Sequence, residues 1–309
     1  MQFDWVISVP VWGDRCVNAF LQVGLPAIKS ALGERRPKFV VHTDQPTLMA
    51  TALASYPHEI KPVPAGRGVH QSAGAGNREA LALAPIGSCV AFINADMVPS
   101  VEVFAAAEQR FEQGKKVIMM AASRTIGAVP PIGAASRELL HWTMEHRHPA
   151  IIECFFGTGR STIPWAIYFK RGDDIVLHGF HLHPFAVVKR DAKTTFHGVS
   201  IDSDLMDAFQ REEVHLVTDA DEASFAEMSP PERVFGLMSE PFKVEHVASW
   251  ASVRTTPLQR WLFTLPITIV GSGNARQLPI CEDISRRLRL YKPSGPPKWR
   301  RLLNQIPVR

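Results

Sequence analysis

Cysteine is scarce in this sequence, and the few cysteines do not form pairs. Cys16, Cys89, Cys154 and Cys281 lie far apart, and no C-x-x-C occurs. Neither a zinc knuckle nor a disulfide framework is therefore predicted. Reduced, buried thiols in a cytoplasmic protein are the expectation.

A segment that could cross a bilayer is also missing. The longest apolar stretch, WLFTLPITIVG at residues 261–271, is broken by Pro266 and is shorter than the roughly 20 residues that a bilayer requires. At the N-terminus, Asp4 interrupts a short apolar run, which argues against a signal peptide. We expect a soluble protein that is at most attached to a membrane surface.

Stretches that carry charge of only one sign are rare, and the exception is the C-terminal end. The formal net charge is +4, which is too weak to indicate a nucleic-acid-binding protein, and no specific nucleic acid partner is predicted. Residues 291–309 contain no acid and carry these basic side chains: Lys292, Lys298, Arg300, Arg301 and Arg309. We expect a solvated terminus there, with peripheral contact to anionic lipid as the alternative.

Strand and helix patterns are plentiful in the first part of the chain. Apolar residues make up 46% of the 309 residues, which allows a sizeable core in one large α/β domain or two joined lobes. The alternation from residue 4 to about residue 123 predicts a parallel or mostly parallel sheet covered by helices. The first helical pattern spans residues 16–32 with a kink at Pro26. From residue 229 on, helices with proline breaks are expected.

Three candidate site positions follow predicted strands. They are the turn at Gly13, Asp44 after FVVHT, and Asp96 at the end of the strand predicted in GSCVAFINAD. Ligands of parallel sheets bind beyond the carboxyl ends of the strands, so we expect these positions to converge on one edge. A buried carboxylate needs a partner, an exposed position or a metal ion. Asp96 alone fits either a Mg²⁺ or Mn²⁺ ligand on a diphosphate or a loop acid before the next helix.

Two further clusters contain residues that often carry chemistry. LHGFHLHPF places His181 and His183 two residues apart, so on a strand they face the same side. They could bind a metal ion or a diphosphate, or they could belong to a turn with ordinary hydrogen bonds. SIDSDLMDAF places Asp202, Asp204 and Asp207 before or at the start of a predicted helix. The helix dipole explains one acid there, and explains three less well.

Two arginines are candidates for phosphate contacts. Arg67 lies in the glycine-rich stretch AGRGVHQSAGAGN, which we expect to be a loop. Its backbone N–H groups could approach phosphates closely, or the stretch could be a flexible connection with no ligand. The stretch matches neither a P-loop nor a dinucleotide fingerprint. Arg124 follows the strand predicted at residues 115–123 and could reach a diphosphate or form a surface salt bridge. No G-x-S-x-G occurs, so a hydrolase of that type is discounted.

AGNREALALAPIGSCVAFINADMVPS, at residues 75–100, resembles the central segment of GT-A-type glycosyltransferases, especially the family-2-like enzymes. In that family an asparagine-bearing helix leads into an apolar strand that ends in a D-x-D-type motif. SVPVWGDRCVNAFLQVGLPAI, at residues 8–28, is similar to the family's first strand and helix. The resemblance covers roughly residues 4–124. It implies a GT-A-like, Rossmann-type, mostly parallel sheet flanked by helices, and we expect a helical C-terminal extension after it.

The resemblance also implies a metal-dependent donor site. Asp96 falls where the motif's metal-binding acid lies, so it would hold Mn²⁺ or Mg²⁺ on the donor diphosphate, with His181 or His183 assisting. Asn94 stands in place of the first acid of the motif, which is a departure from the family pattern.

Other site residues follow from the same resemblance. An inverting sugar transfer needs a carboxylate that takes the acceptor's proton, and the family's late acidic motif points to Asp204 first and Asp202 second. The resemblance also implies that Asp44 and Asn77 hold the nucleoside, and the other expected contacts to the nucleotide part of the donor are Arg67, Arg124, Pro10 and Asn94.

The function that the resemblance implies is transfer of a sugar from a nucleoside-diphosphate sugar to a hydroxyl-bearing acceptor such as a glycan, in glycan or polysaccharide synthesis. Residues 1–125 would bind the nucleotide sugar, residues 126–228 would bind the acceptor and carry catalysis, and residues 229–309 would form the helical extension. One alternative is a sugar-phosphate nucleotidyltransferase, although VPVWGDRCV lacks its glycine- and arginine-rich signature. A non-catalytic binding or scaffold protein with a degenerate fold is the other.

Overall fold

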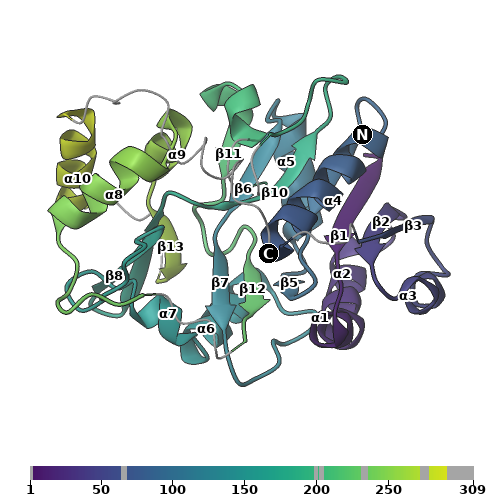
Figure 1. Ribbon diagram of the computed structural model, residues 1–309, viewed down its shortest axis with the longest axis horizontal. Helices are drawn as coiled ribbons and strands as arrows, with labels where there is room; N and C mark the ends of the chain where they lie inside the picture. The colour runs from purple at the N-terminus through teal and green to yellow at the C-terminus, as the bar shows by residue number, and fades with distance from the viewer. Residues whose placement is uncertain are drawn as a thin grey trace.

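The computed structural model describes residues 3–63, 68–197, 201, 205–230, 236–271 and 278–290. A seven-stranded sheet forms its centre (Figure 1). The strands, in spatial order, are β11 (Val214–Leu216), β6 (Val117–Met120), β10 (His183–Val188), β4 (Cys89–Phe92), β1 (Trp5–Pro10), β2 (Lys38–Thr43) and β3 (His58–Pro62). β10 runs antiparallel to β4 and β6, and the other pairs are parallel. The predicted mostly parallel α/β sheet is confirmed.

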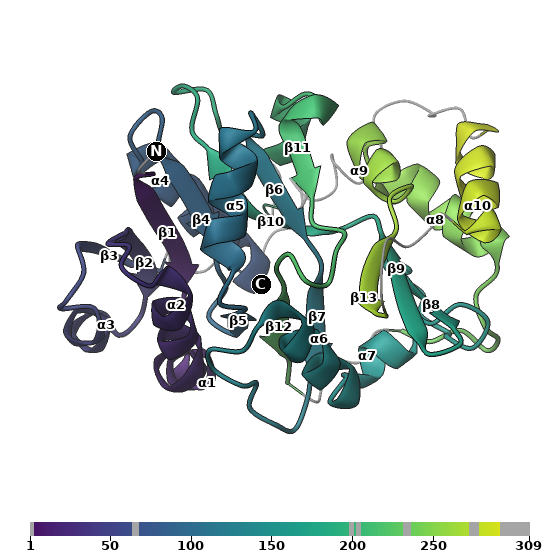
Figure 2. The ribbon, with the colours of Figure 1, turned by 180° about the vertical axis from the view of Figure 1, so that it is seen from behind.

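Helices cover both faces of this sheet, because side chains along each strand alternate between the faces. On β1, Trp5, Ile7 and Val9 belong to one buried cluster, and Val6 belongs to another. Figures 1 and 2 show α4 over one face and α2 with α5 over the other. The helices of this part are α1 (Asp14–Ala19), α2 (Leu25–Leu32), α3 (Pro46–Ala52), α4 (Val69–Leu83) and α5 (Val103–Glu112).

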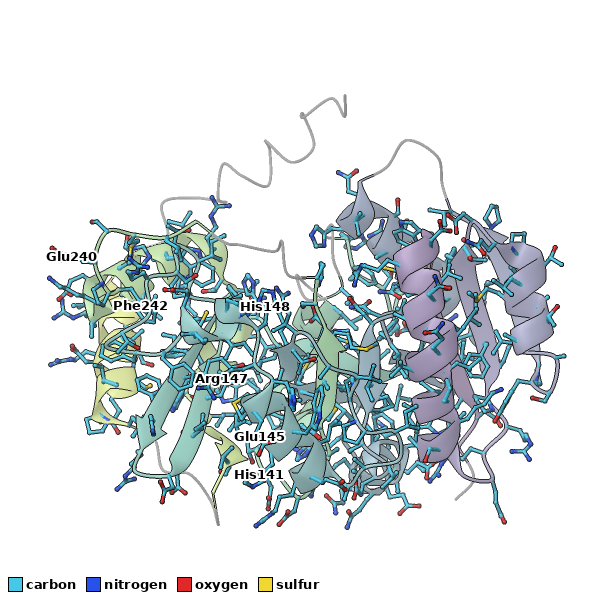
Figure 3. All side chains as sticks on the ribbon, turned by 90° about the horizontal axis from the view of Figure 1, so that it is seen from below. His141, Glu145, Arg147, His148, Glu240 and Phe242 are labelled. Atoms are coloured by element: carbon cyan, nitrogen blue, oxygen red, sulfur yellow. The ribbon has the colours of Figure 1, made fainter. Side chains whose placement is uncertain are left out.

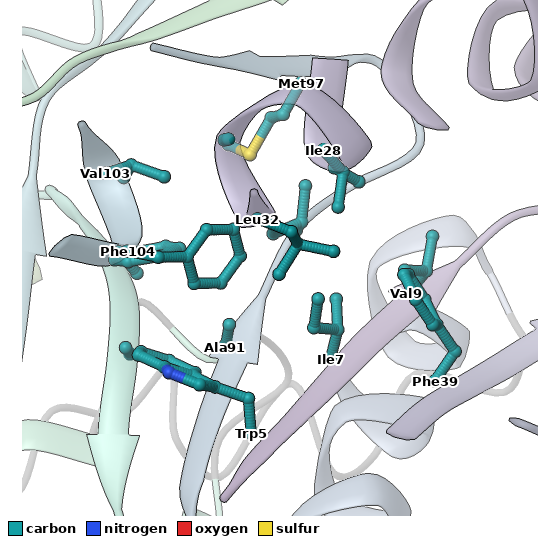
Figure 4. Packing of buried hydrophobic residues seen from close by; sticks show 14 of the residues in the cluster. Trp5, Ile7, Val9, Ile28, Leu32, Phe39, Ala91, Met97, Val103 and Phe104 are labelled. Atoms are coloured by element: carbon teal, nitrogen blue, oxygen red, sulfur yellow. The ribbon is translucent and has the colours of Figure 1, made fainter. Parts of the chain in front are cut away.

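The core beneath α2 and α5 is built around Trp5 (Figure 4). Its ring meets Phe104 edge to face, with 5.0 Å between the centroids, a favoured aromatic geometry. The indole Nε1 donates to Glu108 Oε1 at 2.8 Å, so the polar end of this buried ring is satisfied. Met97, which directly follows Asp96, packs into the same cluster and anchors the turn that carries the acid.

Two smaller sheets extend the molecule. One contains β5 (Met97–Pro99), β12 (Phe225–Met228) and β7 (Ala122–Thr125), and the other contains β13 (Ile267–Val270), β9 (Asp174–Gly179) and β8 (Ala166–Arg171). Residues from both predicted halves, 1–125 and 126–228, therefore share the central sheet and the first small sheet. The remaining helices are α6 (Ser136–Glu145), α7 (Pro149–Ile152), α8 (Val244–Arg254), α9 (Pro257–Leu262) and α10 (Pro279–Leu290), with 3-10 turns at Leu205–Ala208 and Arg211–Glu213.

The predicted helix over residues 16–32 is interrupted by a π-helical turn at Phe20–Gly24. Pro26 has no N–H to donate into the preceding turn, and a π turn accommodates that loss. The predicted glycine-rich loop is also corrected, since α4 begins at Val69 and includes Gly74 and Gly76. A Cβ at Gly76 would lie 2.8 Å from His42 Nδ1, so this glycine lets α4 approach β2 closely.

The third correction concerns the strand before Asp96. β4 ends at Phe92, and Asp96 lies in the turn that leads to β5.

The fourth correction concerns residues 229–267, which were expected to be helical. They contain α8 and α9, but the β-branched run after Pro266 forms β13 and pairs with β9. Instead of the helix predicted near Asp202, the described residues form the short 3-10 turn at Leu205–Ala208.

A half-buried ion cluster joins α5 to β11. Glu222 Oε1 accepts from Arg110 Nε and interacts with His215 Nε2, both at 2.8 Å. Burial raises the pKa of Glu222, but the hydrogen bonds from His215 and Arg110 outweigh burial and bring that pKa down to about 2.

Within the described residues, no helix is both long enough and apolar enough to cross a membrane.

Candidate active site

A cleft of about 510 Å³ opens where the carboxyl ends of β1 and β4 meet the sheet of β5, β12 and β7. It is lined by these predicted site residues: Pro10, Asn77, Asn94, Asp96, Arg124, His181 and His183. A second hollow of about 680 Å³ lies at the amino ends of β1 and β2 and is lined by none of them. Since ligands of parallel sheets bind at the carboxyl edge, the first cleft is the candidate site.

Asp96 faces this cleft beside an arginine. Its side chain is 13% exposed, and Oδ2 lies 3.8 Å from Nη2 of Arg15 in α1. Its backbone carbonyl accepts from Met228 N at 2.8 Å, which joins the turn to β12. Arg15 Nη1 lies 3.5 Å from the Met228 carbonyl oxygen. The acid is therefore held at the cleft by backbone bonding, with a cation next to its carboxylate.

A second arginine–carboxylate pair lies on the small sheet. Arg124 of β7 and Glu227 of β12 are cross-strand neighbours, and Arg124 Nε lies 3.3 Å from Glu227 Oε1. Ser229 Oγ donates to the same oxygen at 3.1 Å. The Arg124 guanidinium also lies 5.5 Å from the centroid of the Trp165 ring, within cation–π range.

His148 fixes the strands that carry this pair. Its backbone N–H donates to the Arg124 carbonyl at 3.0 Å, and its ring Nε2 donates to the Pro230 carbonyl at 3.1 Å. Nδ1 accepts from Ala150 N at 3.0 Å, which is consistent with a proton on Nε2. Figure 3 shows His148 beyond the end of α6. This buried histidine therefore ties the end of β7 to the segment that follows β12.

The histidines predicted on one strand are divided between a turn and a strand. β10 begins at His183, and His181 lies in the turn before it, so the same-side rule for strands does not apply to the pair. His183 Nε2 lies 2.7 Å from the Phe92 carbonyl oxygen, and His181 Nε2 lies 3.3 Å from that of Arg254. A carbonyl oxygen only accepts, so each Nε2 carries the proton, and a metal contact of either histidine would come from Nδ1.

The side chains around Asp96 offer little net negative charge to a resident metal ion. Asn94 is uncharged, and the carboxylate of Asp96 lies beside the Arg15 guanidinium. In the part of the chain that the structure describes, no group of three or more His, Cys, Asp or Glu side chains could hold a metal ion. The Mn²⁺ or Mg²⁺ site expected from the sequence stays a prediction.

Asn77 and Asp44 have different positions relative to the cleft. Asn77 is buried in α4, and its Oδ1 accepts from Ser8 Oγ at 2.8 Å, which joins the helix to β1 at the cleft wall. Asp44 is exposed and does not line the cleft. Its Oδ2 accepts from Gly13 N at 3.0 Å, so it holds the turn after β1.

Three predicted residues, Arg67, Asp202 and Asp204, lie outside the described residues. Ile201, which immediately precedes Asp202 in the sequence, lines the cleft.

Several cleft residues were not predicted from the sequence. Arg15, Trp12, Trp165 and Glu227 all line the cleft. Arg15 follows the first strand and its turn, so the strand-end argument that selected Gly13 applied to it as well. Glu227 is the one polar residue in the strand FAEM, and it is 8% exposed. An acid in an otherwise apolar strand was a usable signal.

No family model matches this chain, and no curated protein matches it. The chain is similar to solved structures of S. aureus TarS. For TarS residues 1–349 the TM-score is 0.44 at 11% identity, covering 85% of this chain and 70% of that one. For the same fragment in complex with UDP-GlcNAc the TM-score is 0.47 at 12% identity, covering 85% and 71%. A 4-diphosphocytidyl-2C-methyl-D-erythritol synthase from Anaerococcus prevotii DSM 20548 gives 0.27 at 14% identity, covering 40% and 56%. The function proposed below rests on the cleft residues.

Proposed function

We propose that this protein is a glycosyltransferase that moves a sugar from a nucleoside-diphosphate sugar to a hydroxyl-bearing acceptor, such as a glycan. The observation that carries the proposal is the convergence of two arginines, two carboxylates and two tryptophans at the carboxyl edge of a mostly parallel sheet. Guanidinium groups suit phosphate oxygens because their N–H donors match two acceptors at once. Carboxylates suit sugar hydroxyls, and indole rings can stack on a base or a sugar face.

The donor's nucleotide would lie along the wall formed by β1 and α4. Pro10 and Asn77 border that wall, and Asn94 is in the turn after β4. Asp44 would act at this wall through the turn that it holds. Arg124 would contact the diphosphate from the small sheet, and Arg67 keeps its predicted phosphate contact.

The transfer itself would be a direct displacement at the anomeric carbon. Asp204, or Asp202 as the second choice, would take the proton of the acceptor hydroxyl as the new bond forms. The leaving diphosphate gains negative charge in this step, and that charge must be neutralised. The sequence-based prediction assigns this to Mn²⁺ or Mg²⁺ on Asp96, with His181 or His183 assisting, and the small net negative charge of the neighbouring side chains motivates the inference below.

The basic composition of residues 291–309 suggests where the acceptor is met. The basic residues 291–309 would place the protein at the surface of an anionic membrane, on the cytoplasmic side, where lipid-linked acceptors could reach the cleft. Binding of the full-length chain to vesicles with and without anionic lipid tests this component, and equal binding to neutral vesicles would contradict it.

A thermal-shift screen of UDP, GDP, ADP and CDP tests the donor assignment, followed by donor turnover with the sugar nucleotides of the base that binds. A ligand at about 100 times its dissociation constant stabilises the folded protein by about 2.7 kcal/mol, which a melting curve resolves. We expect one of the four nucleotides to stabilise the protein selectively. If none raises the melting temperature at millimolar concentration, with or without MnCl₂, the proposed function is wrong.

A further inference from the structure

Among the described residues that line the cleft, the arginines and carboxylates form two pairs. Arg15 lies beside Asp96, and Arg124 lies beside Glu227. Each guanidinium is opposed by one carboxylate, so the four side chains together carry no net charge. A site built to bind a divalent cation by itself would be expected to present excess negative charge.

The register of the small sheet brings these pairs next to each other. Glu227 on the central strand β12 is opposite Arg124 on β7 and opposite Met97 on β5. Asp96 directly precedes Met97 and is bonded through its backbone to Met228. Both pairs therefore border the same part of the cleft, where a diphosphate can contact them together.

The two arginines differ in how firmly they are held. The side chain of Arg124 is 22% exposed and is fixed by Glu227 and by the Trp165 ring. That of Arg15 is 50% exposed, and its 3.8 Å contact to Asp96 is longer than a hydrogen bond. Arg15 can therefore turn from Asp96 to an entering anion with little loss of interaction energy. Arg124 is already held at the cleft and needs no such movement.

Resting on the proposed function, we infer that Arg15 and Arg124 together bind the donor diphosphate and neutralise it as it leaves, so that turnover does not require a divalent cation. The bond from the anomeric carbon to the β-phosphate oxygen breaks, and its electron pair stays on that oxygen. The acceptor oxygen forms the new bond to the carbon, and its proton goes to the base carboxylate. The two guanidiniums donate N–H bonds to the oxygens on which the negative charge increases.

The test measures UDP, GDP, ADP and CDP binding by calorimetry in three buffers that contain EDTA, MgCl₂ or MnCl₂. We expect the nucleotide that binds most tightly to bind in EDTA with a dissociation constant within about threefold of that in MnCl₂, a difference of under 1 kcal/mol. Arg15→Gln and Arg124→Gln should each weaken binding in EDTA by about 10- to 100-fold, the usual loss of a charge-assisted contact. Arg286→Gln, on the exposed face of α10, changes the charge equally and should leave binding unchanged.

A second variant guards against misfolding. Arg124→Gln leaves Glu227 without its guanidinium, so the double variant Arg124→Gln/Glu227→Gln restores charge balance, and it should fold like the wild type yet still bind weakly. If wild-type binding disappears in EDTA, or if the Arg15 and Arg124 variants bind as tightly as the wild type, this inference is overturned while the transferase proposal stands. If none of the four nucleotides binds in any buffer, the donor assignment on which the inference rests fails with it.

Discussion

The contact between Gly76 of α4 and His42 of β2 permits a quantitative prediction. A Cβ added at Gly76 would lie 2.8 Å from His42 Nδ1 and 2.9 Å from Cγ, closer than real Cβ contacts allow. The ring cannot move away easily, because it is 1% exposed and its Nε2 is bonded to Glu79 Oε2 at 2.9 Å. Glu79 belongs to the same helix, so a shift of α4 would also strain this bond.

Gly76→Ala should therefore destabilise the protein. Overpacking of this kind costs about 1–3 kcal/mol, while alanine in place of glycine inside a helix gains up to about 1 kcal/mol. The expected net loss is about 1–2 kcal/mol in the free energy of unfolding, measured by urea denaturation. Because α4 also carries Asn77 at the cleft wall, nucleotide affinity should fall together with stability.

A double-mutant cycle with His42→Ala isolates the contact. Without the imidazole, the added methyl group meets open space, so Gly76→Ala should become neutral or stabilising in that background. Equal destabilisation by Gly76→Ala in both backgrounds would refute the assignment of the cost to this contact.

Three further predictions concern charge and aromatic contacts. The pKa of Glu222 is about 2 in the folded protein, below its ordinary value, so its contribution to stability is present above about pH 4.5 and is lost as the pH falls toward 2. After allowance for solvent screening this contribution amounts to about 1–2 kcal/mol. In urea-unfolding experiments across pH, Glu222→Gln should reduce the fall in the free energy of unfolding between pH 4.5 and pH 2. An unchanged fall would contradict the assignment. Asp96→Asn removes the anion opposite Arg15, so calorimetry in EDTA should show nucleotide affinity that is equal or higher, whereas a tenfold loss would favour a metal role for Asp96. Trp165→Leu removes the ring that supports Arg124 and should weaken nucleotide binding by about 2- to 30-fold, with unchanged affinity in the same assay as the contrary result.

The alternating strands and helices were predictable because they depend on neighbours in the sequence. Apolar periods of two and of 3.6 residues identify strands and helices locally. The carboxyl-edge rule selected Asp96, which lines the cleft, together with Gly13 and Asp44, which do not. The corrections occurred where tertiary contacts override local pattern. Gly76 is helical because its missing Cβ admits His42, and the run after Pro266 is a strand because β9 offers it a partner.

The electrostatic character of the site was decided by the tertiary structure alone. Whether Asp96 faces a metal ion or a guanidinium depends on where α1 places Arg15, and no spacing within the sequence around Asp96 contains that information. Glu227 reaches Arg124 only because β12 is inserted between β5 and β7. Local sequence determines which elements form, whereas the pairing of charges from distant segments follows from strand register and helix packing, which the chain settles only when it folds.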